Sequence, residues 1–140
     1  MRAIGIAVVV GFSVIASSAL AGPQKAPVGA PSAGWSARHR GMVVVRADVS
    51  LTNGCWSDPR LEPMFSGNFP VTRLGFAAMA DNNSRPGQMC SMIFRKVTVC
   101  TEARAPAAAR AVVVVGSDGR LSTAIRRTAP DCQGPRRPQD

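Results

Sequence analysis

Residues 41–51 read GMVVVRADVSL, and this stretch decides the fold class because apolar side chains recur at every second position. One face of the stretch carries Val43, Val45, Ala47, Val49 and Leu51. The other face carries Val44, Arg46, Asp48 and Ser50. A period of two with one polar face is typical of a half-buried β-strand. The Asn53-Gly54 pair that follows predicts a turn, because both residues tolerate positive φ.

Three further strand-like runs lie toward the C-terminus. Residues 69–80 (FPVTRLGFAAMA) place on one face Leu74, Phe76, Ala78 and Ala80. Residues 111–115 (AVVVV) and 121–126 (LSTAIR) flank the turn sequence Gly116-Ser117-Asp118-Gly119. Two short β-patterned runs joined by such a turn predict a β-hairpin.

Residues 87–100 (GQMCSMIFRKVTVC) also read as a strand, which we expect to be central in the sheet. Phe94 is expected in the core. Met89 and Met92 are expected there too, because methionine in a strand typically fills space in the core. Arg95 and Lys96 fall on opposite faces of the apolar run. They predict a bulge or an exposed edge at this point, and they are candidate contacts for a partner.

The strands together predict an all-β protein, a small disulfide-stapled antiparallel β-sandwich or partly open barrel. Pro59 and Pro63 limit residues 60–64 to an edge strand or irregular structure, because proline donates no backbone hydrogen bond. No stretch predicts a helix of ten residues, and Pro106 interrupts the only alanine-rich segment.

Four segments are predicted along the chain. Residues 1–21 have a basic start, an apolar run and the small-residue pattern Ala19-Leu20-Ala21, which predicts a cleaved signal peptide rather than a retained membrane anchor. Residues 22–34 (GPQKAPVGAPSAG) predict a disordered spacer, because they offer no large apolar group to bury. Residues 35–132 form the expected β-domain, and residues 133–140 a disordered basic tail. The expected location is secreted or periplasmic, with no membrane span after signal cleavage.

The cysteines are even in number and all follow the signal peptide: Cys55, Cys90, Cys100 and Cys132. An even count in a small exported domain predicts disulfides. The preferred pairing is Cys55–Cys90 and Cys100–Cys132, because Cys55 follows one strand and Cys90 opens another. On a single strand, ten residues separate Cys90 and Cys100 by about 33 Å, too far for a bond. A Cys90–Cys100 bond would require a hairpin between them and stays the alternative.

No metal or cofactor is expected. A copper site of Met89, Cys90 and Met92 would use soft sulfur ligands, yet on a strand the two methionines point to opposite faces. The sequence favours a binding protein over a hydrolase, because the single histidine, His39, lies between Arg38 and Arg40 without a nucleophile motif. No glycine-rich phosphate loop occurs. We therefore expect a protein that is not an enzyme.

The formal net charge is +9, and 15 of the 17 basic residues are arginine. The expected function is an exported, non-catalytic binding or interaction module, such as an accessory subunit or inhibitor, acting on another exported or envelope protein. The alternative is an arginine-rich protein that binds anionic surfaces: lipopolysaccharide, acidic glycan or nucleic acid. The binding candidates are Trp35, Trp56, Arg95, Lys96, Arg126 and Arg127. The sequence predicts neither the partner nor the oligomeric state.

Overall fold

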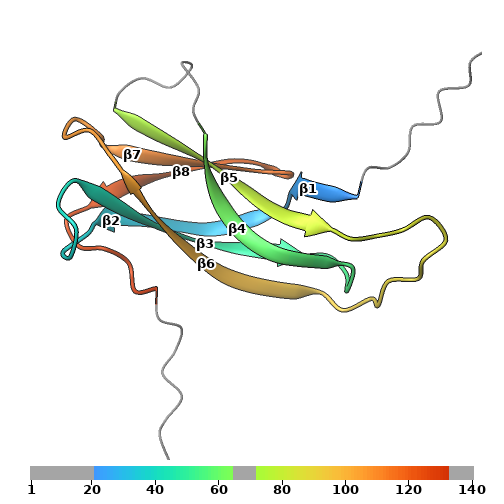
Figure 1. The fold of residues 1–140 in the computed structure, drawn as a ribbon. Coiled ribbons are helices and arrows are strands. Elements are labelled where there is room, and N and C mark those ends of the chain that lie inside the picture. The colour runs from blue at the N-terminus through green and yellow to red at the C-terminus, as the bar shows by residue number, and fades with distance from the viewer. Residues whose placement is uncertain (1–20, 65–71, 133–140) are drawn as a thin grey trace, which may run out of the picture.

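The structure, a computed structural model, describes residues 21–64 and 72–132 (Figure 1). These residues form strands and loops only, which confirms the all-β prediction. The strands are β1 Gly22–Lys25, β2 Val28–Trp35, β3 Met42–Leu51, β4 Trp56–Met64, β5 Arg73–Asn82, β6 Arg95–Arg104, β7 Ala111–Gly116 and β8 Gly119–Arg126. The predicted signal peptide, apart from Ala21, and the predicted tail lie outside the described residues.

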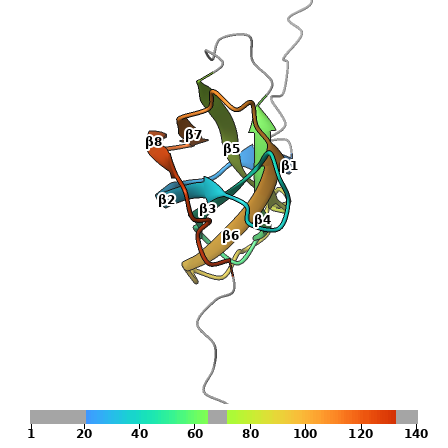
Figure 2. The same ribbon diagram turned by 90° about the vertical axis from the view of Figure 1, so that its left-hand side faces the viewer.

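The strands form one curled open sheet, a half-barrel seen along its axis in Figure 2. Its order is β1-β5-β7-β8-β2-β3-β6, and β4 pairs with β5 away from this path. β1 and β7 share one side of β5, because β7 pairs with residues 73–77 and β1 with residues 79–82. The open edges of the sheet are therefore β4 and β6. Most pairs are antiparallel, as expected, but β5–β7 and β2–β8 are parallel.

The core lies inside the curl and follows the pattern of β3. Its alternating residues are almost wholly buried: Val43, Val45, Ala47, Val49 and Leu51. Phe76 of β5 and Val112 and Val114 of β7 complete the interior from the opposite strands. The predicted hairpin is confirmed as β7–β8, with Gly119 at a φ of 135°, a conformation that suits glycine. The proline-limited edge strand is confirmed as β4, and residues 69–71 of the strand predicted over residues 69–80 lie outside the described part.

The prediction of a disordered spacer over residues 22–34 is wrong, because β1 and most of β2 occupy it. β1 pairs with β5, and β2 pairs with β3 from Val28 to Trp35. Backbone hydrogen bonds hold both strands, and they need no large side chains. Small residues are required at one position, since a Cβ on Gly34 would collide with the backbone carbonyl of Thr128.

The prediction for residues 87–100 is also wrong in part. β6 begins at Arg95, and residues 83–94 form a long loop before it. β6 is an edge strand rather than a central one, and its register with β3 has no bulge. The edge position explains Arg95 and Lys96, since a strand paired on one side only leaves its charged side chains in solvent.

Candidate functional site

The two disulfides are those preferred from the sequence. Cys55–Cys90 joins the residue before β4 to the loop before β6, with Cα atoms 5.4 Å apart. Cys100–Cys132 joins β6 to the C-terminal segment, with Cα atoms 5.9 Å apart. The first bond therefore links segments next to the two open edges of the sheet. With Cys90 oxidised, a copper site based on its thiolate is ruled out in this state of the protein.

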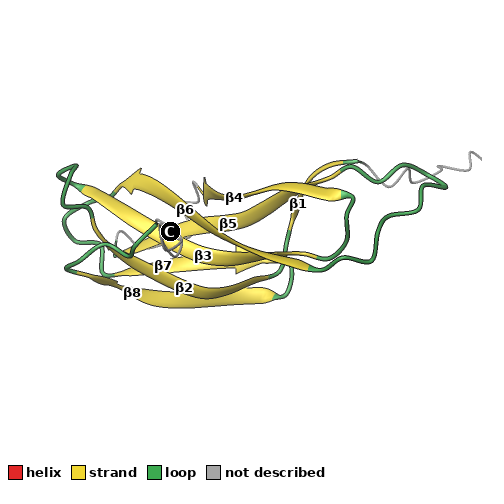
Figure 3. Ribbon diagram, turned by 90° about the horizontal axis from the view of Figure 1, so that it is seen from below, coloured by secondary structure: helices red, strands yellow, loops and turns green. Residues whose placement is uncertain are grey.

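The loop between β5 and β6 extends beyond the end of the sheet (Figure 1, Figure 3). Its residues 88–94, called here the apolar loop, expose four large hydrophobic side chains. The exposed fractions are 96% for Met89, 94% for Met92, 60% for Ile93 and 61% for Phe94. The predicted core positions of Phe94, Met89 and Met92 are therefore wrong. Only one other large hydrophobic side chain among the described residues is exposed, Leu121, at the lower fraction of 37%.

The apolar loop is fixed at its base. Cys90 is bonded to Cys55, and the Gly54 backbone N–H donates to the Ser91 carbonyl at 2.9 Å. At the first residue of the apolar loop, the Gln88 N–H donates to the Arg85 carbonyl, and the Gln88 side-chain oxygen accepts from the Arg85 N–H. These bonds hold the backbone on both sides of Met89. The exposed side chains thus stand on an anchored backbone.

Cationic side chains flank the apolar loop on both sides. Arg85 precedes it, and Arg95 and Lys96 follow it, all three exposed. Residues 82–101 contain no aspartate or glutamate. The Arg95 guanidinium donates to the Trp56 carbonyl at 3.2 Å, which positions the side chain without neutralising its charge. The apolar loop therefore carries a positive rim.

The binding candidates separate into two groups at opposite ends of β3. Trp56, Arg95 and Lys96 lie at one end, where Leu51 pairs with Arg95. Trp35 pairs with Val43 at the other end, and its neighbour Gly34 pairs with Arg126, which Arg127 follows. Both tryptophans are half-buried and pack against the core.

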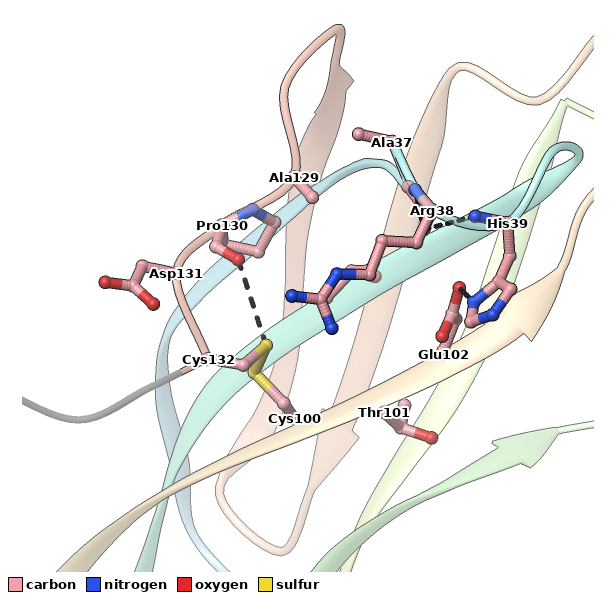
Figure 4. Close-up of a pocket in the computed structure, with 12 residues that line it drawn as sticks. Ala37, Arg38, His39, Cys100, Thr101, Glu102, Ala129, Pro130, Asp131 and Cys132 are labelled. Carbon is pink, nitrogen blue, oxygen red and sulfur yellow. Dashed lines mark hydrogen bonds and ion pairs between the residues drawn. A yellow bond between two sulfur atoms is a disulfide. The ribbon is translucent and has the colours of Figure 1, made fainter.

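A pocket of about 640 Å³ lies at this second end, beside the Cys100–Cys132 bond (Figure 4). His39 Nδ1 lies 2.9 Å from Glu102 Oε1. Because an ionised carboxylate only accepts, the hydrogen of the imidazole lies on Nδ1 and faces Glu102. The Ser36 hydroxyl oxygen accepts from the backbone N–H groups of Arg38 and His39, which makes Ser36 a turn residue.

Sequence reasoning missed the His39–Glu102 pair, because 63 residues separate its members. Glu102 lies opposite Val44 in the β3–β6 register, and the turn before β3 carries His39. A correct register for β6 would have placed Glu102 near this turn. A carboxylate that orients a histidine is a common catalytic element, but the nearby hydroxyl of Ser36 is engaged by the turn.

The pKa of the Glu102 carboxyl lies below its ordinary value of 4.5, chiefly because it accepts a hydrogen bond from His39. The Ser36 hydroxyl and the charge of Arg38 act in the same direction. A carboxyl with a lowered pKa stabilises the fold above its ordinary pKa, and this contribution is lost as the pH falls through the lowered value.

We expect His39→Gln to raise the pKa of Glu102 toward its ordinary value. The physical reason is that the substitution removes the largest cause of the shift. An NMR titration of the Glu102 carboxyl carbon measures it, and Ser36→Ala provides a smaller change for comparison. An unchanged Glu102 titration in the His39→Gln protein would contradict the pairing.

Arg60 on β4 joins a second set of charges. Its Nε donates to Glu62 at 2.8 Å, and its Nη1 lies 3.1 Å from a carboxylate oxygen of Asp58 and 3.1 Å from one of Asp81. The hydrogen bond to Glu62 is the largest cause that raises the pKa of Arg60, and Asp81 adds to it. Because Asp81 lies on β5, these ion pairs brace β4 against its neighbour. The ion pairs of Arg60 therefore serve a structural role.

The fold and its surface define a disulfide-stapled half-barrel that carries an anchored apolar loop at one end and a His-Glu pocket at the other. Comparisons with protein-family models, with curated proteins and with solved structures find no significant match to this chain. Within residues 21–64 and 72–132, no helix is long and apolar enough to cross a membrane. The two disulfides indicate an oxidising, extracellular-type environment.

Proposed function

We propose that the protein is an exported, non-catalytic binding module that acts through its apolar loop. The observation that carries this proposal is the exposure of Met89, Met92, Ile93 and Phe94 on one anchored segment. Contiguous apolar side chains with a polar rim are typical of interaction sites, because their burial against a partner removes apolar surface from water.

The anchoring of the loop supports the same function. A segment that is already held in place loses less conformational freedom on binding than a free one. Cys55–Cys90 and the Gly54–Ser91 hydrogen bond supply this restraint. The core below the apolar loop supplies a rigid support, because β3 ends at the fully buried Leu51, shortly before Gly54 in the sequence.

Two features support export. The disulfides require an oxidising compartment, and residues 1–21 have the pattern of a signal peptide. Both features agree with a secreted or periplasmic location. The partner then belongs to the cell envelope or its surroundings, as an exported protein or an anionic surface.

A photoreactive residue at position 92, introduced in the exporting cell, tests the proposal. Irradiation is expected to join the loop to its partner, and mass spectrometry of the product identifies whether that partner is protein or lipid. The matched control places the same photoreactive residue at Ser122, an exposed position on β8. Equal products from both positions, or no product from position 92, would contradict a binding role for the loop.

A further inference from the structure

We infer that the partner of the apolar loop is an anionic lipid surface. In this arrangement the apolar loop enters the interface while Arg85, Arg95 and Lys96 contact the headgroups. The inference rests on the proposed function of the loop and adds the chemistry of the partner.

The first step concerns the shape of the loop. Met89 and Met92 are exposed at 96% and 94%, so their side chains make almost no contact with the rest of the protein. The loop that carries them extends beyond the end of the sheet (Figure 1, Figure 3), so it forms a projection rather than a groove. A bilayer accepts such a projection, since an interfacial segment buries its apolar side chains at the boundary between headgroups and acyl chains.

The second step concerns the side chains themselves. Methionine, isoleucine and phenylalanine at positions 89, 92, 93 and 94 carry no polar group that would need a directed partner. A protein interface typically fixes its partner by hydrogen bonds and shaped pockets around aromatic or arginine anchors. The four exposed side chains of the apolar loop offer apolar area without directed hydrogen-bonding groups, which is sufficient for lipid.

The third step is the charge. The three cations flank the apolar loop, and residues 82–101 contain no acid that would repel anionic headgroups. Each basic residue near an anionic leaflet raises binding by about fivefold. The three together correspond to a preference of about 100-fold over a neutral bilayer, and screening reduces it as salt rises.

The test uses the exported protein, with its N-terminus verified by mass spectrometry so that no apolar leader contributes. Binding is measured by co-sedimentation with vesicles of phosphatidylcholine containing phosphatidylglycerol, and with vesicles of phosphatidylcholine alone. We expect binding to the anionic vesicles that weakens with salt, and much weaker binding to the neutral ones. No binding to the anionic vesicles would overturn the inference.

Two variants locate the contact. Replacing the four exposed apolar side chains of the loop by serine is expected to abolish binding, whereas Leu121→Ser on β8 leaves it unchanged. Changing Arg85, Arg95 and Lys96 to glutamine is expected to reduce binding about 100-fold. Its control loses the same charge by changing three other exposed residues to glutamine: Arg120, Arg126 and Arg127. A control that loses as much binding as the rim variant would show that only the total charge matters and would overturn the inference.

The two proposals fail in different ways. If vesicles do not bind but the photoreactive residue at position 92 joins the loop to a protein, the binding module stands and the lipid inference is wrong. If neither occurs, both are wrong. Circular dichroism of each variant confirms that the sheet is intact, and the rim and apolar variants test the inference independently of each other.

Discussion

Replacing Cys55 and Cys90 together by alanine is expected to lower the free energy of unfolding by about 4 kcal/mol. The bond closes a loop with a sequence separation of 35, and in the chain-entropy model its loss frees the unfolded chain. The midpoint of thermal unfolding should fall by about 15 °C. Denaturant titration of the oxidised protein and of the variant measures the difference.

The matched variant, Cys100→Ala with Cys132→Ala, removes a loop of similar length, with a separation of 32. We expect a similar loss of stability from it, but a different local effect. Only the first variant releases the apolar loop, so trypsin should cleave after Arg95, at the end of that loop, faster in that variant alone. Equal cleavage in the two variants would show that Cys55–Cys90 does not hold the loop.

Phe76→Ala should lower the free energy of unfolding by about 3–5 kcal/mol. Phe76 is 1% exposed and is the largest fully buried side chain among the described residues, so the substitution leaves a cavity that the surrounding strands fill only in part. Chemical denaturation monitored by circular dichroism measures the loss.

Phe94→Ala is the control, because it removes the same side chain from an exposed position. Its expected effect on stability is within about 0.5 kcal/mol, the usual range for surface substitutions. Both phenylalanines read as core residues in the sequence. A large loss from Phe94→Ala would place this side chain in the core and would contradict the exposed loop.

The strongest sequence patterns predicted the elements that they describe. β3 and the β7–β8 hairpin were predictable because alternation reports burial of one face directly. β1 and β2 were not, because backbone pairing holds them and their small residues carry no such pattern. A composition poor in large apolar groups therefore indicates disorder only where no neighbouring strand supplies hydrogen bonds.

The apolar loop, in contrast, was predicted to be part of a strand and is not one. Residues 88–94 have strand-like composition, but Pro86 and Gly87 precede them and Cys90 is tied to Cys55. The preferred disulfide pairing was correct, although the argument against Cys90–Cys100 assumed one continuous strand and β6 begins only at Arg95. A sequence pattern cannot distinguish a buried apolar run from one that is exposed to solvent, since both contain the same residues.

The candidate site was predictable only in parts. Arg95 and Lys96 stood out because charges within an apolar run conflict with burial. The His39–Glu102 pair depends on the register of two strands distant in sequence, which no local pattern contains. Long-range register is the information that a single sequence lacks here.

The prolines of β4 also bear on aggregation. An open sheet has two edges through which copies of a chain can pair and grow into fibrils. At the β4 edge, Pro59 and Pro63 offer no N–H group, and the register shifts between Ser57 and Arg60. At the β6 edge, Arg95 and Lys96 repel the like charges of a second copy. The half-barrel can therefore stay open without polymerising, which leaves its exposed apolar side chains available to a partner.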